Sequence, residues 1–167
     1  MIEMLRVTAP DQIKTTSILA RGIWTQHYVP IIGQAQVDYM LAKLQSVRAI
    51  AQQMADGYEY YLASDNGTPV GYFAIVPNLA KHSTLLSKIY VTQERRGTGL
   101  GKAMVTFIEK RCAELGIREL WLTVNRNNSD SIDFYQRMGF ATTESLVQHI
   151  GNGFVMDDYR MAKQQIE

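Results

Sequence analysis

The chain has 167 residues, of which 46% are hydrophobic and 20% charged, and its formal net charge is +1. These values are typical of one folded domain over residues 1–167; they exclude a disordered chain and give no reason to expect nucleic acid as a partner. The single cysteine, Cys112, excludes an internal disulfide framework. Because the sequence has no long apolar run and no signal-like start, we expect a cytoplasmic protein with no membrane partner.

Hydrophobic spacing predicts the elements of the amino-terminal part of the chain. They are a strand at residues 2–8, a helix from Pro10 to about Tyr28, and a second helical region at 34–55 that breaks near Ser46. Pro10 suits the first turn of a helix, whereas Pro30 and Gly33 are expected to end the first helix.

The rest of the chain predicts more strands than helices. The expected elements are strands at 59–64, 70–76 and 85–91, a helix at 99–115, a strand at 120–124, a helix at 129–138, and strands at 140–150 and 154–162. Asp65-Asn66-Gly67 is a hairpin turn signal. The nearly all-apolar strand at 120–124 predicts burial on both faces. The order β-αα-βββ-α-β-α-ββ predicts a mixed α/β sheet with helices on both faces.

Charge is unevenly divided along the chain. Residues 1–80 carry five bases and six acids, residues 81–118 eight bases and three acids, and residues 119–167 four bases and seven acids. The middle segment, at +5, is where we expect an anionic ligand. A solvated helix face with a chance excess of Lys and Arg is the other interpretation.

A glycine-rich segment joins the strand at 85–91 to the helix that follows. Gly97, Gly99 and Gly101 leave the backbone bare beside the unpartnered N–H groups of the helix start, an arrangement that binds phosphate or pyrophosphate. A tight turn that needs glycine only for its geometry is the alternative. The positions that a P-loop requires hold Arg96 and Ala103, and the spacing for a dinucleotide fingerprint is absent.

Two segments in order resemble the motifs of the GNAT superfamily of acetyl-CoA-dependent N-acetyltransferases. Residues 96–101 (RGTGLG) fit its phosphate motif, and residues 128–140 (NSDSIDFYQRMGF) resemble its Asn-to-Gly-Phe motif, with Ser131 in place of the usual Ala. The resemblance implies a largely antiparallel, twisted sheet. Residues 86–91 (LSKIYV), the FYQRMGF segment and an Asp-x-x-Met ending at 158–161 are most similar to the polyamine (spermidine/spermine) acetyltransferase-like branch.

The resemblance implies acetyl transfer from acetyl-CoA to a primary amine by direct attack, without a metal. The residues expected to bind the co-substrate are Ile89, Tyr90, Val91, Arg96, Gly97, Thr98, Gly99, Leu100, Gly101, Lys102 and Asn128. Arg95 would add positive charge. Asn128 is also placed to cap its helix, a role compatible with binding. Cys112 falls on the apolar stripe of its helix and is expected to be structural.

Tyr135 is the residue expected to take part in the chemistry, because a phenol can protonate or stabilise the leaving thiolate. An aromatic packing role is the alternative. For the general base, Tyr90, His149, Asp157 and Asp158 stay open as candidates. The three histidines lack metal-ligand spacing.

The acceptor is expected to be set by the first two helical regions. Trp24 and Tyr28, with Tyr39, are candidates for a cationic pocket, and Asp38 and the C-terminal acids for pairing a second ammonium; core packing is the alternative for Trp24 and Tyr39. The predicted function is therefore acetylation of a small amine, with a polyamine as one candidate. Acetylation of a protein N-terminus or lysine, and a non-catalytic acyl-CoA-binding module, remain as alternatives. A homodimer through the terminal strands is also expected.

Overall fold

The structure, a computed structural model, describes residues 1–165. Its elements are β1 (Ile2–Arg6), α1 (Pro10–Ile32), α2 (Gln34–Met40), a π-helical segment (Leu41–Gln45), α3 (Val47–Ala55), β2 (Glu59–Asp65), β3 (Thr68–Asn78), β4 (Ser83–Val91), a short 3-10 turn (Gln93–Arg95), α4 (Leu100–Glu114), β5 (Glu119–Asn125), α5 (Ser129–Arg137), β6 (Ala141–Gly151) and β7 (Phe154–Gln164). Within these residues the order matches the predicted one.

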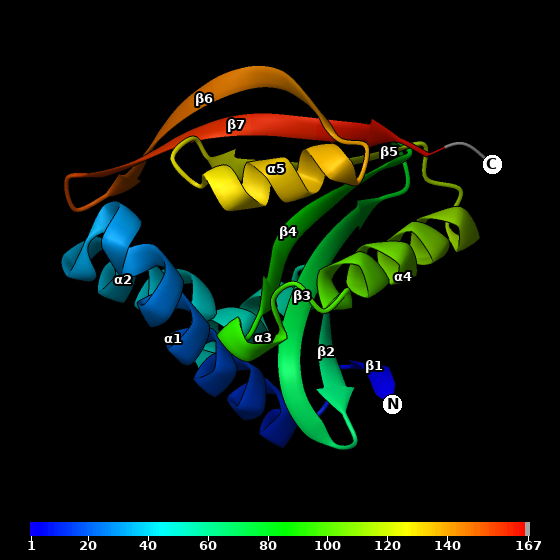
Figure 1. Ribbon diagram of the computed structural model, residues 1–167, viewed down its shortest axis with the longest axis horizontal. Coiled ribbons are helices and arrows are strands. Elements are labelled where there is room, and N and C mark those ends of the chain that lie inside the picture. Colours follow the sequence, from blue (N-terminus) through cyan, green and yellow to red (C-terminus); the bar gives the residue numbers. More distant parts are fainter. Residues whose placement is uncertain (166–167) are drawn as a thin grey trace.

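All seven of these strands form a single sheet in the order β1-β2-β3-β4-β5-β7-β6 (Figure 1). Only β4 and β5 run parallel among the paired strands, and the other neighbours are antiparallel. The mixed, largely antiparallel sheet predicted from the sequence is therefore confirmed. β6 is an outer edge with mostly exposed side chains, and its pairing with a second copy stays a prediction.

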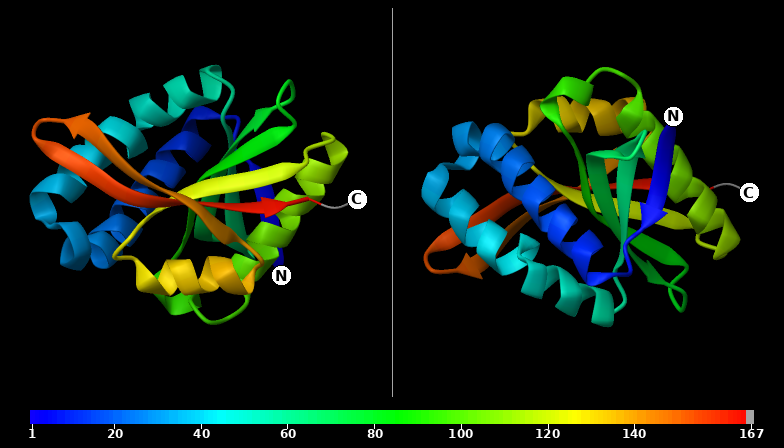
Figure 2. Two further views of the ribbon diagram at one scale, coloured as in Figure 1. Left: turned by 90° about the horizontal axis from the view of Figure 1, so that it is seen from above. Right: turned by 90° about the horizontal axis from the view of Figure 1, so that it is seen from below.

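Helices cover both faces of the sheet at β2 and β3, where consecutive residues are buried. On β2, Tyr60 and Leu62 pack with α1, α2 and α3, whereas Tyr61 and Ala63 pack with α4 and α5. Since side chains alternate between faces along a strand, two cores form, one on each side. Figure 2 shows α1 to α3 on one face and α4 and α5 on the other.

The first helix is longer than the sequence predicts, because Pro30 lies inside α1 and Gly33 alone ends it. Proline removes one helical hydrogen bond, to the carbonyl of Gln26, but its fixed φ suits a helix. Both Pro30 and Gln26 are exposed, so water can satisfy that carbonyl. The predicted break at Ser46 is confirmed: its hydroxyl accepts a hydrogen bond from the N–H of Ala49 at 3.1 Å and caps α3.

The prediction that residues 120–124 are buried on both faces is wrong. Leu120, Leu122 and Val124 are buried, whereas Trp121 and Thr123 on the other face of β5 are only half-buried. The guanidinium of Arg160 lies 4.7 Å from the centre of the Trp121 ring. A long cationic side chain from β7 thus covers this face where a helix was expected.

The sheet opens between β4 and β5. Only Ser83–Leu85 of β4 pairs with Glu119–Trp121 of β5, and beyond this point the two strands diverge (Figure 1). On its other side β4 stays paired with β3, although Ser87 is skipped, because Ala74 pairs with Lys88 and Ile75 with Leu86. Such a bulge bends a strand and increases its twist. The bend leaves one edge of β4 without a neighbouring strand.

The hairpin of β6 and β7 reaches across to α2 (Figure 1). The Tyr39 hydroxyl donates to the carbonyl of Ile150 at 2.9 Å, and the Lys43 ammonium donates to the same carbonyl at 2.6 Å. The Gln36 amide also donates to the carbonyl of Val155 at 3.0 Å. These contacts hold the hairpin tip against α2 and the π-helical segment that follows it.

Candidate active site

A cavity of about 830 Å³ lies where β4 and β5 diverge. It is bounded by α1, the π-helical segment, β4, the glycine-rich loop, α5 and β7. Of the residues predicted to bind the co-substrate, those lining it are Ile89, Tyr90, Val91, Arg96, Gly97, Gly99, Gly101, Lys102 and Asn128. Thr98 and Leu100 do not line it: the Thr98 hydroxyl donates to the carbonyl of Arg95, and Leu100 is buried in the core.

The glycine-rich loop leads into the first turn of α4 with its backbone exposed. Gly97 and Gly99 have φ angles of 75° and 87°, which residues with a Cβ adopt only at a cost. The N–H groups of Leu100, Gly101 and Lys102 donate no hydrogen bond within residues 1–165. These N–H groups lie at the positive end of the helix dipole, so this turn can hold a pyrophosphate.

The three positive side chains of this segment are not equivalent. Arg95 donates to the carboxylate of Asp65 at 2.6 Å and forms an ion pair with the β2–β3 turn, which partly neutralises it. Arg96 and Lys102 form no ion pair within residues 1–165. The charge that the sequence assigned to this segment is therefore available mainly from Arg96 and Lys102.

Gly101 serves a different purpose from the other two glycines. A Cβ at this position would lie 3.1 Å from the ring of Phe134, the residue before Tyr135. The missing side chain lets α5 pack closely against the start of α4. The two predicted motifs are therefore in direct contact.

We expect Gly99→Ala to weaken coenzyme A binding by about 5- to 30-fold. A left-handed backbone costs an alanine roughly 1–2 kcal/mol, and a rearranged loop would misplace the N–H groups of the following turn. No neighbouring atom lies within 4 Å of the added Cβ, so the effect would come from the backbone alone. Calorimetric titration with coenzyme A measures it; unchanged affinity would contradict the assigned role of the loop.

The open edge of β4 continues from the phosphate loop into the cavity. From Leu86 to Val91 the strand pairs with β3 only, so every second residue directs its N–H and C=O groups to the open side. Ile89, Tyr90 and Val91 line the cavity along this edge. Unpaired strand groups can bind an extended chain that carries amides, as a neighbouring strand would.

Asn128 both caps α5 and joins it to α1. Its side-chain oxygen accepts a hydrogen bond from the N–H of Ser131 at 3.4 Å, and His27 Nε2 lies 3.2 Å from the same oxygen. The amide nitrogen donates to the hydroxyl of Tyr28 at 3.4 Å. Asn128 is almost fully buried, so it links these groups at the cavity wall.

Tyr135 is buried in the wall of the cavity, with 8% of the residue exposed. Its ring packs against Phe134 and Phe140, with centroids 5.6 and 5.7 Å away. Its hydroxyl makes no hydrogen bond within residues 1–165. Burial, followed by the neighbouring Tyr28, raises the pKa of the Tyr135 phenol well above its usual value, so the hydroxyl keeps its proton.

An aromatic cluster of Trp24 and Tyr28 from α1 and Tyr90 from β4 lines the cavity. The ring centroids of Trp24 lie 4.4 Å from Tyr28 and 5.5 Å from Tyr90. Both predicted acceptor residues, Trp24 and Tyr28, therefore line the cavity. Trp24 is also buried in the core, which the packing alternative anticipated, and its indole N–H has no hydrogen-bond partner within residues 1–165.

Lys88 is a buried lysine at the floor of the cavity that the sequence did not indicate. Its ammonium donates to the carbonyl of Leu44 at 2.7 Å, to the side chain of Gln53 at 2.8 Å and to the Tyr60 hydroxyl. Burial lowers the pKa of Lys88 to about 7. The first two contacts tie β4 to the helical region behind it, and the third joins it to β2.

Asp158 is the acid that β7 brings to the cavity. The residue is 3% exposed, and its Oδ1 atom is fully buried without a hydrogen-bond partner within residues 1–165. Burial, with a smaller contribution from the Asp157 charge, raises the pKa of the Asp158 carboxyl to about 6. The electrostatic effect of Asp158 also reaches the Tyr28 hydroxyl.

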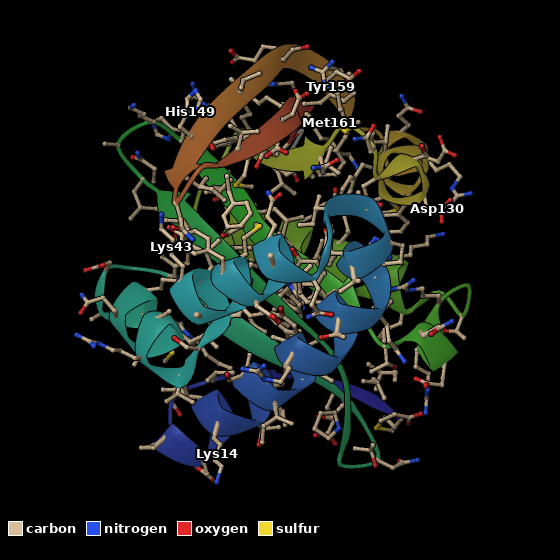
Figure 3. The ribbon with its side chains drawn as sticks, turned by 90° about the vertical axis from the view of Figure 1, so that its left-hand side faces the viewer. Lys14, Lys43, Asp130, His149, Tyr159 and Met161 are labelled. Carbon is tan, nitrogen blue, oxygen red and sulfur yellow. The ribbon has the colours of Figure 1, made fainter. Side chains whose placement is uncertain are left out.

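The other candidate residues lie outside the cavity. His149 is on the exposed β6 strand, on the opposite side of the molecule from Asp130 in Figure 3. Asp157 pairs with Arg126 at 2.8 Å, and Asp38 is exposed and bonded to Gln34. Tyr39 holds the β6–β7 hairpin. Of the four candidate bases, the structure therefore places only Tyr90 and Asp158 at the site.

No three His, Cys, Asp or Glu side chains within residues 1–165 are grouped as metal ligands would be. None of the helices there is both long and apolar enough to cross a membrane.

The family model described as "Acetyltransferase (GNAT) family" matches residues 26–140, which is more than half of the chain. The chain belongs to the GNAT family. The matched region includes the glycine-rich loop and Tyr135, whereas Asp158 lies beyond its end.

Individual GNAT relatives are similar to this chain at different levels. A 5-NmdU N-acetyltransferase of Pseudomonas phage PaMx11 is 36% identical over 87 residues, which are 52% of this chain and 60% of the relative. The first curated relatives are matched over only 40–60% of their own length.

Solved structures show the same fold over nearly the whole chain. The PaiA N-acetyltransferase of Thermoplasma acidophilum, in complex with coenzyme A, has a TM-score of 0.81 at 20% identity and covers 98% of this chain and 99% of that one. The spermidine N-acetyltransferase of Vibrio cholerae, in complex with coenzyme A and spermine, has a TM-score of 0.72 at 16% identity, with 98% and 95% covered.

Proposed function

We propose that this protein transfers the acetyl group of acetyl-CoA to the primary amine of a small molecule. The observation that carries the proposal is one continuous site: the bare first turn of α4, the open edge of β4, and a cavity that contains Tyr135 and Asp158. An anion-binding turn, an amide-binding strand edge and a proton donor follow one another in the order that an acyl-CoA molecule would need.

The residues present fit coenzyme A. The N–H groups at the start of α4, with Arg96 and Lys102, would hold the pyrophosphate, and the edge of β4 from Ile89 to Val91 would bind the amides of the pantetheine arm. When bound, acetyl-CoA supplies the activated acetyl thioester. A backbone N–H on the open side of β4 would donate to the thioester oxygen as an oxyanion-hole donor does.

The amine would attack the thioester directly. Cys112 is fully buried on α4 and does not line the cavity, and burial raises the pKa of its thiol. A covalent acetyl-cysteine step at this residue is therefore not supported. Tyr135, protonated and with an unbonded hydroxyl, would donate its proton to the leaving sulfur.

The boundary of the cavity favours a small acceptor over an extended peptide. The tip of the β6–β7 hairpin is tied to α2 and the segment after it through Tyr39, Lys43 and Gln36. Gln36 also lines the cavity, so we expect this contact to leave little room there for an extended peptide. Polyamines are among the candidates, and the resemblance of the fold to a spermidine N-acetyltransferase is compatible with them.

A panel of acceptors tests the proposal. The purified protein is incubated with acetyl-CoA and spermidine, simple mono- and diamines, an aminoglycoside, and peptides with a free N-terminus or a lysine, while thiol release and product mass are measured. We expect transfer to at least one small amine and none to the peptides. Preferential transfer to a peptide would favour the protein-acetylating alternative. Coenzyme A binding without any transfer would favour a binding module.

A further inference from the structure

The cavity contains a buried carboxylate that has no partner within residues 1–165. Asp158 is 3% exposed, and neither a hydrogen-bond donor nor a cationic side chain contacts its carboxylate within residues 1–165. Leaving a buried carboxylate without a partner is costly, and its neighbour on the strand has a cationic one: Asp157 forms an ion pair with Arg126 at 2.8 Å. A ligand cation would supply the missing partner.

The surroundings of Asp158 suit a primary ammonium. Met156 lies two residues before Asp158 on the same face of β7 and also lines the cavity. Asn125, which stands opposite Asp158 in the β5–β7 register, lines it too. The aromatic cluster of Trp24, Tyr28 and Tyr90 lines the same cavity, and aromatic faces attract cations. The carboxylate, the aromatic cluster and the proton-donating phenol of Tyr135 therefore border one space.

The family motifs do not assign a role to Asp158, since the matched region ends at residue 140. We propose that Asp158 binds the ammonium group of the acceptor and accepts the proton that it must lose before attack. This inference rests on the proposed amine acetyltransferase function and deepens it, because it names the residue that selects a cationic primary amine and activates it.

The proton and electron balance of the reaction can be written with these two side chains. The acceptor arrives as R–NH₃⁺, and the Asp158 carboxylate takes one proton. The nitrogen lone pair of R–NH₂ then forms the bond to the acetyl carbon, and the C–S bond breaks with its electrons on sulfur. Sulfur takes the proton of Tyr135, a second proton from nitrogen restores the phenol, and Asp158 releases its proton to water. The sum is ammonium plus thioester giving amide, thiol and H⁺.

The charged groups of the cavity lining, besides Asp158 and the residues below, are Arg95, Arg96, Lys102, Asp130 and Arg137. His27 on α1 contacts Asn128, and burial followed by the Arg96 charge lowers its pKa. Lys88 on β4 is held by three acceptors. Tyr28 and Tyr90 keep their protons, because burial raises the pKa of each. Beside Asp158 on β7, Asp157 is paired with Arg126. Asp130, in the first turn of α5, is exposed, so Asp158 is the buried carboxylate of the cavity that can take up a proton.

The test compares Asp158→Asn with Asp157→Asn. The second variant removes the same charge at the preceding residue, whose side chain does not line the cavity. For the best amine of the panel, we expect Asp158→Asn to lower kcat/KM by about 100- to 1,000-fold and to remove an acid limb near pH 6. Asp157→Asn should keep kcat/KM within about threefold. The coenzyme A affinity of both variants should match the wild type, and circular dichroism verifies that both are folded.

A low-pKa acceptor separates proton acceptance from a structural role. Trifluoroethylamine is largely neutral at pH 7.5, so it offers no ammonium to bind and no proton to remove before attack. We expect the loss caused by Asp158→Asn to be at least tenfold smaller for this amine. A His27→Gln variant should retain the acid limb. Loss of that limb in His27→Gln, with its retention in Asp158→Asn, would overturn the assignment.

The outcomes distinguish failure of this inference from failure of the proposed function. If the wild type acetylates amines and Asp158→Asn keeps its kcat/KM and pH profile, Asp158 has no such role although the activity stands. Equal losses in both aspartate variants would also overturn it. If the wild type binds coenzyme A and acetylates no amine, the proposed function fails and the inference fails with it.

Discussion

Tyr135→Phe is expected to lower kcat by about 100-fold or more and to leave coenzyme A affinity nearly unchanged. General acid catalysis contributes typically about 10²- to 10⁴-fold, and the substitution removes only the hydroxyl. The ring, which packs between Phe134 and Phe140, is preserved. Because the hydroxyl makes no hydrogen bond within residues 1–165, its removal should also leave the thermal midpoint nearly unchanged. Steady-state kinetics and coenzyme A calorimetry measure the two effects.

The matched control for this prediction is Tyr159→Phe. Tyr159 is a half-buried tyrosine on β7 that lies under the guanidinium of Arg126 and does not line the cavity. The same loss of a hydroxyl there should leave kcat within about twofold. Wild-type turnover in Tyr135→Phe would assign Tyr135 to packing alone and leave the leaving thiolate without a side-chain proton donor at this wall.

Local patterns predicted most of the fold because they depend on near neighbours. The apolar positions of β2 and β3, the turn at Asn66 and the stripe of α4 that contains Cys112 all follow from spacing along the chain. The errors came from long-range contacts. Arg160, far from β5 in sequence, covers Trp121, and the exposed setting of Pro30 lets α1 continue through it.

The candidate site was predictable where a motif is contiguous and not where the sheet assembles it. Gly97, Gly99 and Gly101 were grouped correctly, but the reason for glycine differs among them. Gly97 and Gly99 have a positive φ, whereas Gly101 makes room for the Phe134 ring, and neither reason can be read from the sequence. The opening between β4 and β5 depends on strand register, which no local pattern gives. Asp158 was one of four candidate bases, and its place in the cavity wall, its burial and the ion pair of Asp157 with Arg126 separate it from Asp157.

A second prediction with a large effect concerns the stability of the fold, and it follows from the burial of Asp158. Its pKa is raised from 3.8 to about 6 in the folded chain, mainly by burial. Between these values the folded state holds a proton that the unfolded state has lost, so stability falls as pH rises through this window. Above about pH 7 the ionised carboxylate therefore costs the fold about 3 kcal/mol relative to its protonated form.

Asp158→Asn should recover most of this cost, because the amide has the shape of the protonated acid and never ionises. We expect the variant to be more stable than the wild type by about 2–3 kcal/mol at pH 8, and by less than about 1 kcal/mol at pH 4, where the folded wild type is protonated. Urea unfolding of both proteins at the two pH values measures the difference. A variant no more stable at pH 8 than the wild type would mean that the buried carboxylate is already compensated. A stabilised but inactive variant would mean that the fold tolerates an unpaired charge at Asp158 because an ammonium must be bound there.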